Sequence, residues 1–536
     1  MHNKANKTHH NMRTPLLLLM LGICFGSCTK NFTSMNTDPT KIASVIPTDY
    51  PYMFAYAQMT PTLSPDNFEI GEGAIASIYS QFFSQAAMSF GTDRYVIQPT
   101  WLPAVWNPVY VSAAPQLKTI MAGTDSTSAE NALARIWWVW MFHRVTDYFG
   151  PIPYFQAANG QQDVEYTPQD SIYYDFFKKL DGAVSVLKNH TGEHPFGTYD
   201  LVYGAQSDPV SAWIKFANTL RLRLAMRISY VNAALAKTEA EAAVAAGVMT
   251  DISGDAYMEH TNKTYNEENG LAVTAGWDDL RMSASMASML KGYNDPRMSI
   301  YWQPAVATGL YSGVRNGLYS SEKQIDSNGR SYNSNLGTAW CTWVGDPVNG
   351  NWVTNYSVHQ DIMHAAEAWF LRAEGALNGW SMGDNAQHLY ETGIRTSMAQ
   401  WGITDQTVIG NYVISADTPV APLDGTIHSP RVNNYPIAWS SDPTMQRKQV
   451  AQQKWLALFP DGMEGWAEVR RTNLPELYPL VHSDNTDLPV LPVPVFIKRM
   501  PFLATEEQTN AAAVTRAVQM LGGPDNAATR LWWDVN

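Results

Sequence analysis

The sequence is poor in charged residues and in cysteine. Charged residues make up 16% of the 536 residues, against the ~25% that is usual for globular domains, and only three cysteines occur. The formal net charge is −13, and lysine and arginine form no clustered run. A nucleic-acid partner is therefore not expected, because such partners usually require a basic patch. Hydrophobic residues still reach 45%, which predicts a folded core and not a disordered chain.

Sequence motifs of nucleotide binding and hydrolysis are also missing. We find no GxxxxGK[ST], GxSxG or HExxH pattern. The segment 71–76 (GEGAIA) resembles a relaxed dinucleotide motif, but no predicted strand precedes it. His359 and His364 lie near Glu367, and a metal site would require all three side chains to converge. We expect surface or loop histidines instead, and we predict no catalytic residue, no cofactor and no metal.

Carboxylates and arginines alternate in two helical segments, 367–374 and 464–471. A glycosidase needs two carboxylates about 5–10 Å apart, one of them with a raised pKa. Spacings of three and four residues between opposite charges instead favour ion pairs on a helix face. The sequence therefore favours a protein that is not an enzyme.

The N-terminus has the pattern of an export signal. Lys4, Lys7 and Arg13 precede the apolar run 16–24, which is too short to span a membrane. Residues 25–28 (FGSC) place small residues directly before Cys28, as in a bacterial lipobox. We predict a lipoprotein signal peptide over 1–27 and lipidation of Cys28. The alternative is an ordinary secretory signal with an incidental cysteine.

The mature chain is predicted to be one domain behind a polar leader. Residues 28–50 are rich in turn-forming residues and predict an extended, lipid-anchored leader. No linker interrupts residues 51–536, which we interpret as a single domain. Only Cys341 remains besides the anchor, so an intramolecular disulfide framework is not expected.

Helical periodicity dominates this domain, and strand patterns are few and short. Apolar residues recur at i, i+3, i+4 and i+7, which is typical of amphipathic helices. The segments with this pattern are 130–149, 168–189, 211–230 and 362–377, with further helices expected at 72–90, 386–401 and 444–459. Aromatic, Gly- and Asn-rich excursions without helical period fall near 300–360, 410–440 and 480–505. The sequence predicts an all-α fold of stacked helix-turn-helix units with long loop-rich excursions.

Aromatic side chains in the predicted loops are the candidate ligand contacts. Trp and Tyr rings stack on the C–H face of sugars, and interleaved Asn, Asp and Arg side chains bond the hydroxyls. Any single ring in such a loop can also simply pack under it. One group holds Tyr95, Trp101 and Trp106 with Asp93, Arg94, Gln98 and Asn107, and the other holds Trp302, Tyr311, Trp340, Trp343 and Trp352 with Asn316, Asp346 and Asn351. From these groups we select Tyr95, Trp101, Trp106, Trp302 and Trp343 as candidate binding residues.

Several ordered segments resemble the SusD/RagB family of nutrient-binding outer-membrane lipoproteins. The likeness runs through nearly the whole mature chain and lies mostly in scaffold positions. Its segments are 32–39 (FTSMNTDP), 142–154 (FHRVTDYFGPIPY), 166–175, 213–228 (WIKFANTLRLRLAMRI), 291–297 (KGYNDPR), 367–380, 390–401, 453–475 and 524–534.

The resemblance implies a fold and a function. It implies an all-α scaffold of the TPR type that caps a SusC-like TonB-dependent β-barrel transporter on the cell-surface side of the outer membrane. It also implies binding of an oligosaccharide, or in some members a peptide, without chemistry. Two rivals remain open: a peptide-binding lid of the same transporter class, and a surface glycoside hydrolase. A purely structural partner of the barrel is a weaker third.

Overall fold

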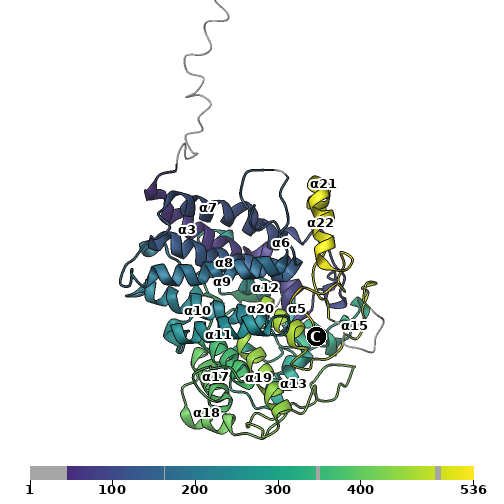
Figure 1. Ribbon diagram of the computed structural model, residues 1–536. Coiled ribbons are helices and arrows are strands. Elements are labelled where there is room, and N and C mark those ends of the chain that lie inside the picture. Colours follow the sequence, from purple (N-terminus) through teal and green to yellow (C-terminus); the bar gives the residue numbers. More distant parts are fainter. Residues whose placement is uncertain (1–44, 162, 346–350, 489–495) are drawn as a thin grey trace, which may run out of the picture. The chain divides into compact units, whose positions relative to one another are not determined.

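The protein is described by a computed structural model that covers residues 45–161, 163–345, 351–488 and 496–536 (Figure 1). Residues 51–536 form one compact unit, and residues 1–50 form a separate unit of which only 45–50 are described. The expected signal peptide, Cys28 and most of the expected leader lie outside the described residues. They stay predictions from sequence.

Long helices build the scaffold of the compact unit, and helices adjacent in the chain pack on one another. Contacts join α7 to α8, α8 to α9, α9 to α10, α10 to α11, and α16 to α17, and Figure 1 shows α7 to α11 as successive layers. This arrangement confirms the predicted stack of helix-turn-helix units. The long helices are α3 (Tyr50–Met59), α7 (Ala114–Gly123), α8 (Ala129–Phe149), α9 (Gln169–Leu187), α10 (Pro209–Arg227), α11 (Ala233–Ala246), α16 (Ala365–Leu377), α17 (Ala386–Gln400), α18 (Gln406–Val413), α19 (Pro443–Leu458) and α20 (Gly462–Thr472).

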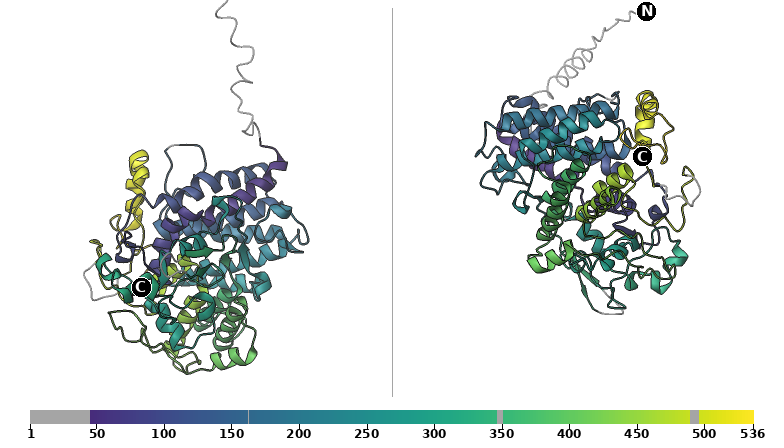
Figure 2. Two further views of the ribbon diagram at one scale, coloured as in Figure 1. Left: turned by 180° about the vertical axis from the view of Figure 1, so that it is seen from behind. Right: turned by 60° about the horizontal axis from the view of Figure 1, so that its bottom comes forward.

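Shorter helices and irregular segments connect and flank this stack. Figure 2 shows the C-terminal pair α21 and α22, coloured yellow, at one edge of the unit. The short helices are α4 (Pro65–Phe68), α5 (Ser77–Tyr79), α6 (Pro103–Asn107), α12 (Gly270–Gly276), α13 (Ala284–Gly292), α14 (Met298–Tyr301), α15 (Ser320–Lys323), α21 (Ala504–Thr509) and α22 (Ala511–Leu521). Two π-helical segments, η3 (Glu69–Ala76) and η5 (Pro108–Ala113), and two short 3₁₀ segments, η2 (Thr60–Thr62) and η8 (Tyr265–Glu267), lie near the candidate site.

Helix α8 shows how the sequence sets the ends and the burial of an element. The Ser128 hydroxyl accepts a hydrogen bond from the Asn131 N–H at 3.2 Å, which caps the first turn. Gly150, with φ of 84°, ends the helix before Pro151. Nearly every side chain of α8 is buried, and the stacked rings of Trp137 and Trp140 lie at its centre. Helices on several sides therefore enclose α8.

The strands are short and pair in twos. All three pairs are antiparallel, and Phe83 pairs with Met282 while Trp343 pairs with Trp352. The pairs are β1 (Phe83–Gln85) with β3 (Leu280–Met282), β2 (Ala256–Met258) with β6 (Gln360–Met363), and β4 (Cys341–Val344) with β5 (Asn351–Thr354). The hairpin β4–β5 falls in the predicted excursion 300–360, and β6 begins at the last residue of that excursion.

The predicted helix over 72–90 is wrong beyond Tyr79. Helix α5 ends there, Gln81 adopts a positive φ of 56°, and the chain then pairs as strand β1. The start of the predicted helix 362–377 is also corrected, because Ile362 lies in β6 and α16 begins at Ala365. In both places tertiary pairing outweighs a local apolar pattern.

Buried ion pairs hold the helices together. The Arg223 guanidinium donates two hydrogen bonds to Glu367, at 2.6 and 2.5 Å, and Arg471 binds both Glu374 and Glu468. The expectation that these carboxylates make ion pairs is confirmed, but most of the partners lie on other helices. Arg372 instead donates to the Met382 carbonyl. Such pairs fix which helix faces meet, because a buried charge without its partner is costly.

Candidate functional site

An open groove of about 470 Å³ is the main candidate site. Its volume lies within the range of small-ligand sites in proteins. Three segments far apart in the sequence form it: α3 to α4, the end of α6 with η5, and the turn at η8. The lining residues are Tyr56, Met59, Thr60, Ser64, Asn67, Asn107, Pro108, Val111, Ser112, Thr264, Asn266 and Glu267.

One wall of the groove is the π-helical segment η5. It begins at Pro108, which has no N–H to donate and so cannot take part in a regular α-helical ladder. The segment presents Val111, 69% exposed, and Ser112 to the groove. Wide helical turns of this kind occur frequently at functional sites.

Uncharged polar groups dominate the lining of the groove. Asn67 donates to the Ser64 hydroxyl at 3.2 Å. In the part of the chain that the structure describes, the exposed side-chain amides of Asn107 and Asn266 make no hydrogen bond. Each free amide offers both a donor and an acceptor, which matches the needs of a sugar hydroxyl. The Tyr56 ring is 45% exposed beside them and supplies a flat apolar surface.

One carboxylate, Glu267, lines the groove, and four others interact with one another from Asp66, which adjoins the lining residue Asn67. We call Asp66, Glu69, Glu267, Asp278 and Asp279 the acidic edge. Glu267 lines the groove itself, and the Tyr265 hydroxyl donates to Asp66. Burial, a hydrogen bond with Asp279, and repulsion from Asp279 and Asp66 together raise the pKa of Glu69 to about 7. The pKa of Asp279 is also raised, mainly by burial.

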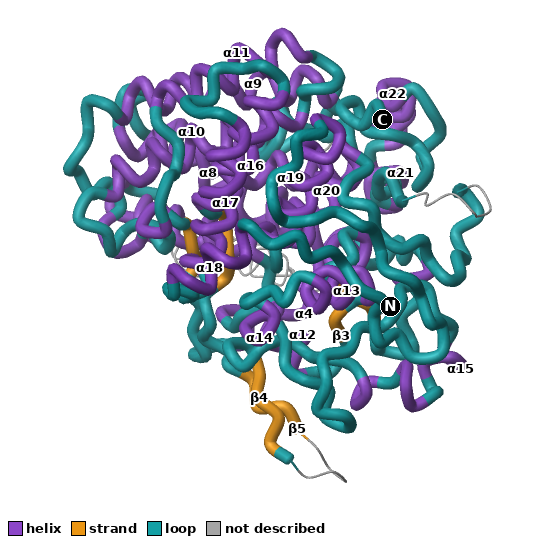
Figure 3. Tube along the Cα trace, turned by 90° about the horizontal axis from the view of Figure 1, so that it is seen from below, coloured by secondary structure: helices purple, strands orange, loops and turns teal. Residues whose placement is uncertain are grey.

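The hairpin β4–β5 brings two indole rings to the far end of the acidic edge. The Trp352 Nε1–H donates to Asp278 at 2.6 Å, and the ring lies edge-on to Trp343 with centroids 5.2 Å apart. Figure 3 shows this hairpin projecting from the rest of the unit. Both indoles are half-buried, so each keeps part of its surface accessible to a ligand.

The structure separates the five predicted aromatic residues into two sets. Tyr95, Trp106 and Trp302 are 4%, 5% and 0% exposed, respectively. Trp302 packs against Phe83 and Phe459, and Trp106 stacks on Tyr110. Enclosed rings offer no face to a ligand, so these three side chains are part of the hydrophobic core and are not accessible ligand contacts.

Trp101 and Trp343 are half-buried and stay candidates. The Trp101 ring lies against Phe90 at 4.9 Å. The backbone N–H groups of Ala86 and Ala87, a few residues before Phe90, donate to the Asp279 carbonyl. Trp101 therefore packs on a segment that begins beside Asp279, and Trp101 itself does not line the groove.

Sequence reasoning missed most of the groove. Asn107 was among the polar residues noted beside Trp106, and it reaches the groove because Trp106 turns inward. Tyr56, Asn67 and Asn266 carried no sequence signal, because nothing local indicates that their segments meet.

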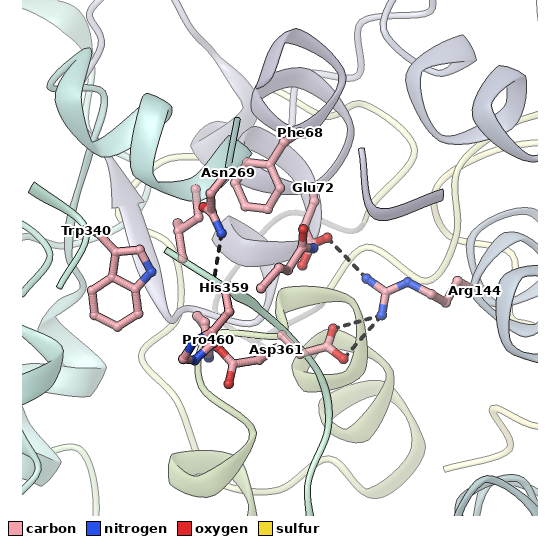
Figure 4. A pocket seen from close by; sticks show the side chains of 11 residues that line it. Phe68, Glu72, Arg144, Asn269, Trp340, His359, Asp361 and Pro460 are labelled. Atoms are coloured by element: carbon pink, nitrogen blue, oxygen red, sulfur yellow. Dashed lines mark hydrogen bonds and ion pairs between the residues drawn. The ribbon is translucent and has the colours of Figure 1, made fainter. Parts of the chain in front are cut away.

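A second, smaller cavity is lined by residues that include Glu72, Arg144 and Asn269 (Figure 4). Arg144 bridges Glu72, at 3.1 Å, and Asp461, at 3.2 Å, and Asn269 donates to the His359 carbonyl at 3.3 Å. Burial raises the pKa of Glu72 to about 7, although Arg144 opposes the shift. The cavity measures about 20 Å³, room for one water molecule and not for a sugar ring.

The two histidines considered as metal ligands have other roles. His359 is exposed and its ring contacts Tyr257. His364 is buried between Asp255 and Asp361, at 3.4 and 2.7 Å. Burial alone would lower the pKa of His364, but these carboxylates raise it to about 10. A protonated imidazole has no lone pair for a metal, so His364 acts as an ion-pair partner.

None of the helices in the described ranges is both long and apolar enough to span a membrane. Stacked helical hairpins with an open polar groove are the features of a helical binding protein. The chain belongs to the SusD-like family, "Susd and RagB outer membrane lipoprotein", whose pattern matches residues 35–534. It is thus a nutrient-binding lipoprotein of the outer membrane, from a family of binding proteins and not of enzymes.

Solved structures of the family are similar over nearly their whole length. A chitin-binding SusD homolog from Flavobacterium johnsoniae is 32% identical, with a TM-score of 0.79, and covers 91% of this chain and 99% of its own. A SusD-like protein from Bacteroides thetaiotaomicron is 30% identical with the same coverage and TM-score. A SusD homolog from Bacteroides uniformis is 26% identical, with a TM-score of 0.81, and covers 92% and 100%. No curated protein matches the chain.

Proposed function

We propose that the protein binds an oligosaccharide at the cell surface and delivers it to a SusC-like TonB-dependent transporter that it caps. The observation that carries this proposal is the groove of about 470 Å³ lined by free amides, hydroxyls and a tyrosine ring. Neutral polar groups beside an aromatic face suit a sugar, whose hydroxyls need donors and acceptors while its C–H face needs a flat partner.

Chitin fragments are the first ligands to test. A family member that is 32% identical is a chitin-binding protein. The amides of Asn67, Asn107 and Asn266 can pair with an N-acetyl group as well as with hydroxyls. Met59 and Val111 line the same groove and supply apolar contact for the acetyl methyl group.

The proposed mechanism is capture followed by closure on the barrel. Ligand binding can drive closure only if the closed state holds the ligand more tightly than the open state. The lipid on Cys28 keeps the protein at the membrane, and a docking surface on the barrel adds to that attachment. The lipid and the barrel together would place the groove on the outer face of the membrane.

The pair of carboxylates with the raised pKa values, Glu69 and Asp279, does not have the spacing of a glycosidase. Glu69 and Asp279 are in hydrogen-bond contact, whereas the two carboxylates of a glycosidase lie about 5–10 Å apart with the sugar between them. The peptide alternative remains an outcome of the test. The acidic edge would then favour basic peptides.

Calorimetry on soluble protein beginning at Thr29 tests the proposal. We expect N-acetylglucosamine oligomers to bind, and we expect Asn107→Ala to weaken them by about 1 kcal/mol or more, the range of a lost hydrogen bond. Asn189→Ala, an exposed asparagine on no groove-lining segment, is the matched control and should change nothing. Binding of basic peptides without binding of any glycan would show that the ligand is a peptide and not an oligosaccharide. Release of reducing ends would show an enzyme.

A further inference from the structure

The groove contains no basic side chain among its lining residues, and it does contain a carboxylate. Glu267 lines it directly and accepts a hydrogen bond from the Thr261 hydroxyl. Asp66 adjoins the lining residue Asn67, and its carboxylate accepts from Tyr265, which adjoins the lining residue Asn266. A ligand in the groove therefore meets one lining carboxylate, Glu267, and no lysine or arginine of the lining, while Asp66 and Lys263 each adjoin a lining residue.

Basic groups compensate the acidic edge only in part. Arg281 and Arg330 are the guanidinium groups in contact with it. Arg281 is 2% exposed and binds Asp278, and Arg330 reaches Asp279 at 3.4 Å and Asp278 at 3.9 Å. These two positive charges lie at the Asp278–Asp279 end of the five carboxylates, and a third cation, Lys263, adjoins the lining residue Thr264 and makes no ion pair in the described ranges. In the described chain, Asp66, Glu69 and Glu267 have no ion pair.

The charge state of Glu69 supports this account. Burial first, and then the neighbouring carboxylates Asp279 and Asp66, raise its pKa to about 7. A carboxyl group resists ionisation in this way where negative charge is crowded and little compensated. A ligand carboxylate in the groove would meet repulsion from Glu267, which lines it, and from Asp66, which adjoins the lining residue Asn67.

We propose that the groove and its acidic edge select neutral oligosaccharides and reject chains that carry uronate or sulfate groups. The proposal rests on the function proposed above and names the ligand class of the same site. The physical basis is repulsion between like charges a few ångströms apart at a partly desolvated surface, which salt screens over about 10 Å at 0.1 M.

The first test compares matched ligands. N-acetylglucosamine oligomers and the same oligomers oxidised to the C6 carboxylate differ at C6 alone, and the dependence of the difference on salt separates the effect of charge from that of the lost hydroxyl. At 20 mM salt we expect the oxidised oligomer to bind roughly 10-fold more weakly, and at 500 mM salt we expect the gap to narrow. Glu267→Gln and Asp66→Asn retain hydrogen-bond acceptors. Each should reduce the ratio of the affinity for the neutral oligomer to the affinity for the oxidised oligomer. Glu507→Gln, an exposed carboxylate on α21, should leave the ratio unchanged.

The second test needs no sugar. Val111 is 69% exposed in the groove, and Cys341 is buried, so Val111→Cys can carry a fluorescent label selectively once Cys28 is removed. Quenching by iodide is compared with quenching by neutral acrylamide at fixed ionic strength. We expect Glu267→Gln to raise iodide quenching about 2-fold and to leave acrylamide quenching unchanged.

The outcomes separate this inference from the proposed function. Equal binding of neutral and oxidised oligomers would overturn charge selection while leaving the glycan-binding function intact. If no glycan binds, the proposed function fails, and only the quenching of the fluorescent label tests charge selection at the groove. Iodide quenching that does not respond to Glu267→Gln would then overturn the inference, and a clear response would support it for whatever ligand the groove takes.

Discussion

The carboxyl group of Glu69 makes the stability of the fold depend on pH in a direction that the structure specifies. Its pKa rises from an ordinary value of 4.5 to about 7 in the folded protein, because of burial and of the neighbours Asp279 and Asp66. The folded state therefore binds the Glu69 proton more tightly than the unfolded state. This contribution to stability is complete below pH 4.5 and is lost as the pH rises through 7.

The size of this stability change follows from the pKa shift of Glu69 and from the solvent exposure of its carboxyl group. A pKa difference of about 2.5 corresponds to roughly 3.4 kcal/mol. Glu69 is only half-buried, so solvent screens the repulsion and we expect about 1 kcal/mol. Glu69→Gln removes the charge and keeps a polar group of the same size. The variant should therefore gain about 1 kcal/mol relative to the wild type between pH 5 and pH 8.

Urea unfolding at pH 5, 6, 7 and 8 measures this difference from the transition midpoints. Glu507→Gln removes a carboxylate from α21 that is far from the acidic edge in sequence, and it should show no such trend. If the difference in the free energy of unfolding between Glu69→Gln and the wild type stays constant from pH 5 to pH 8, the reasoning is refuted. Asp279→Asn should reproduce the trend in part, because it removes one of the two repelling neighbours.

Two further predictions concern the anchor and the core. Cys28→Ser should move the protein from the outer-membrane fraction to the soluble fraction, which cell fractionation measures; membrane retention without acylation would contradict the anchor. Glu367→Gln removes the carboxylate that accepts two hydrogen bonds from the buried Arg223 and leaves Glu464, at 3.7 Å, as its charged partner, so we expect a loss of about 2–3 kcal/mol in the free energy of unfolding. A loss under about 1 kcal/mol would show that this pair does not hold α10 to α16.

Patterns within one element predicted much of the scaffold. The apolar spacing over 130–149 predicted α8, which spans Ala129–Phe149, and Gly150 ends it as expected. The segment 386–401 likewise corresponds to α17 at Ala386–Gln400. Helix α17 buries one face, as the apolar spacing predicts, whereas α8 is buried on nearly all sides, which its spacing alone did not indicate.

The candidate site was harder to predict, for physical reasons. Trp302 and Tyr95 looked like loop aromatics, but rings of that size are most stable when enclosed, and both pack into the core. The groove instead uses Tyr56, Asn67 and Asn266, which come from segments about 200 residues apart. Only the folded arrangement brings them together.

A crystal structure with a bound N-acetylglucosamine oligomer tests the central claim most directly. The account predicts sugar rings in the groove, with hydrogen bonds to Asn107 and Asn266 and one ring face on Tyr56. Sugar bound elsewhere on the surface, with the groove empty and the Asn107→Ala variant binding as tightly as the wild type, would contradict it.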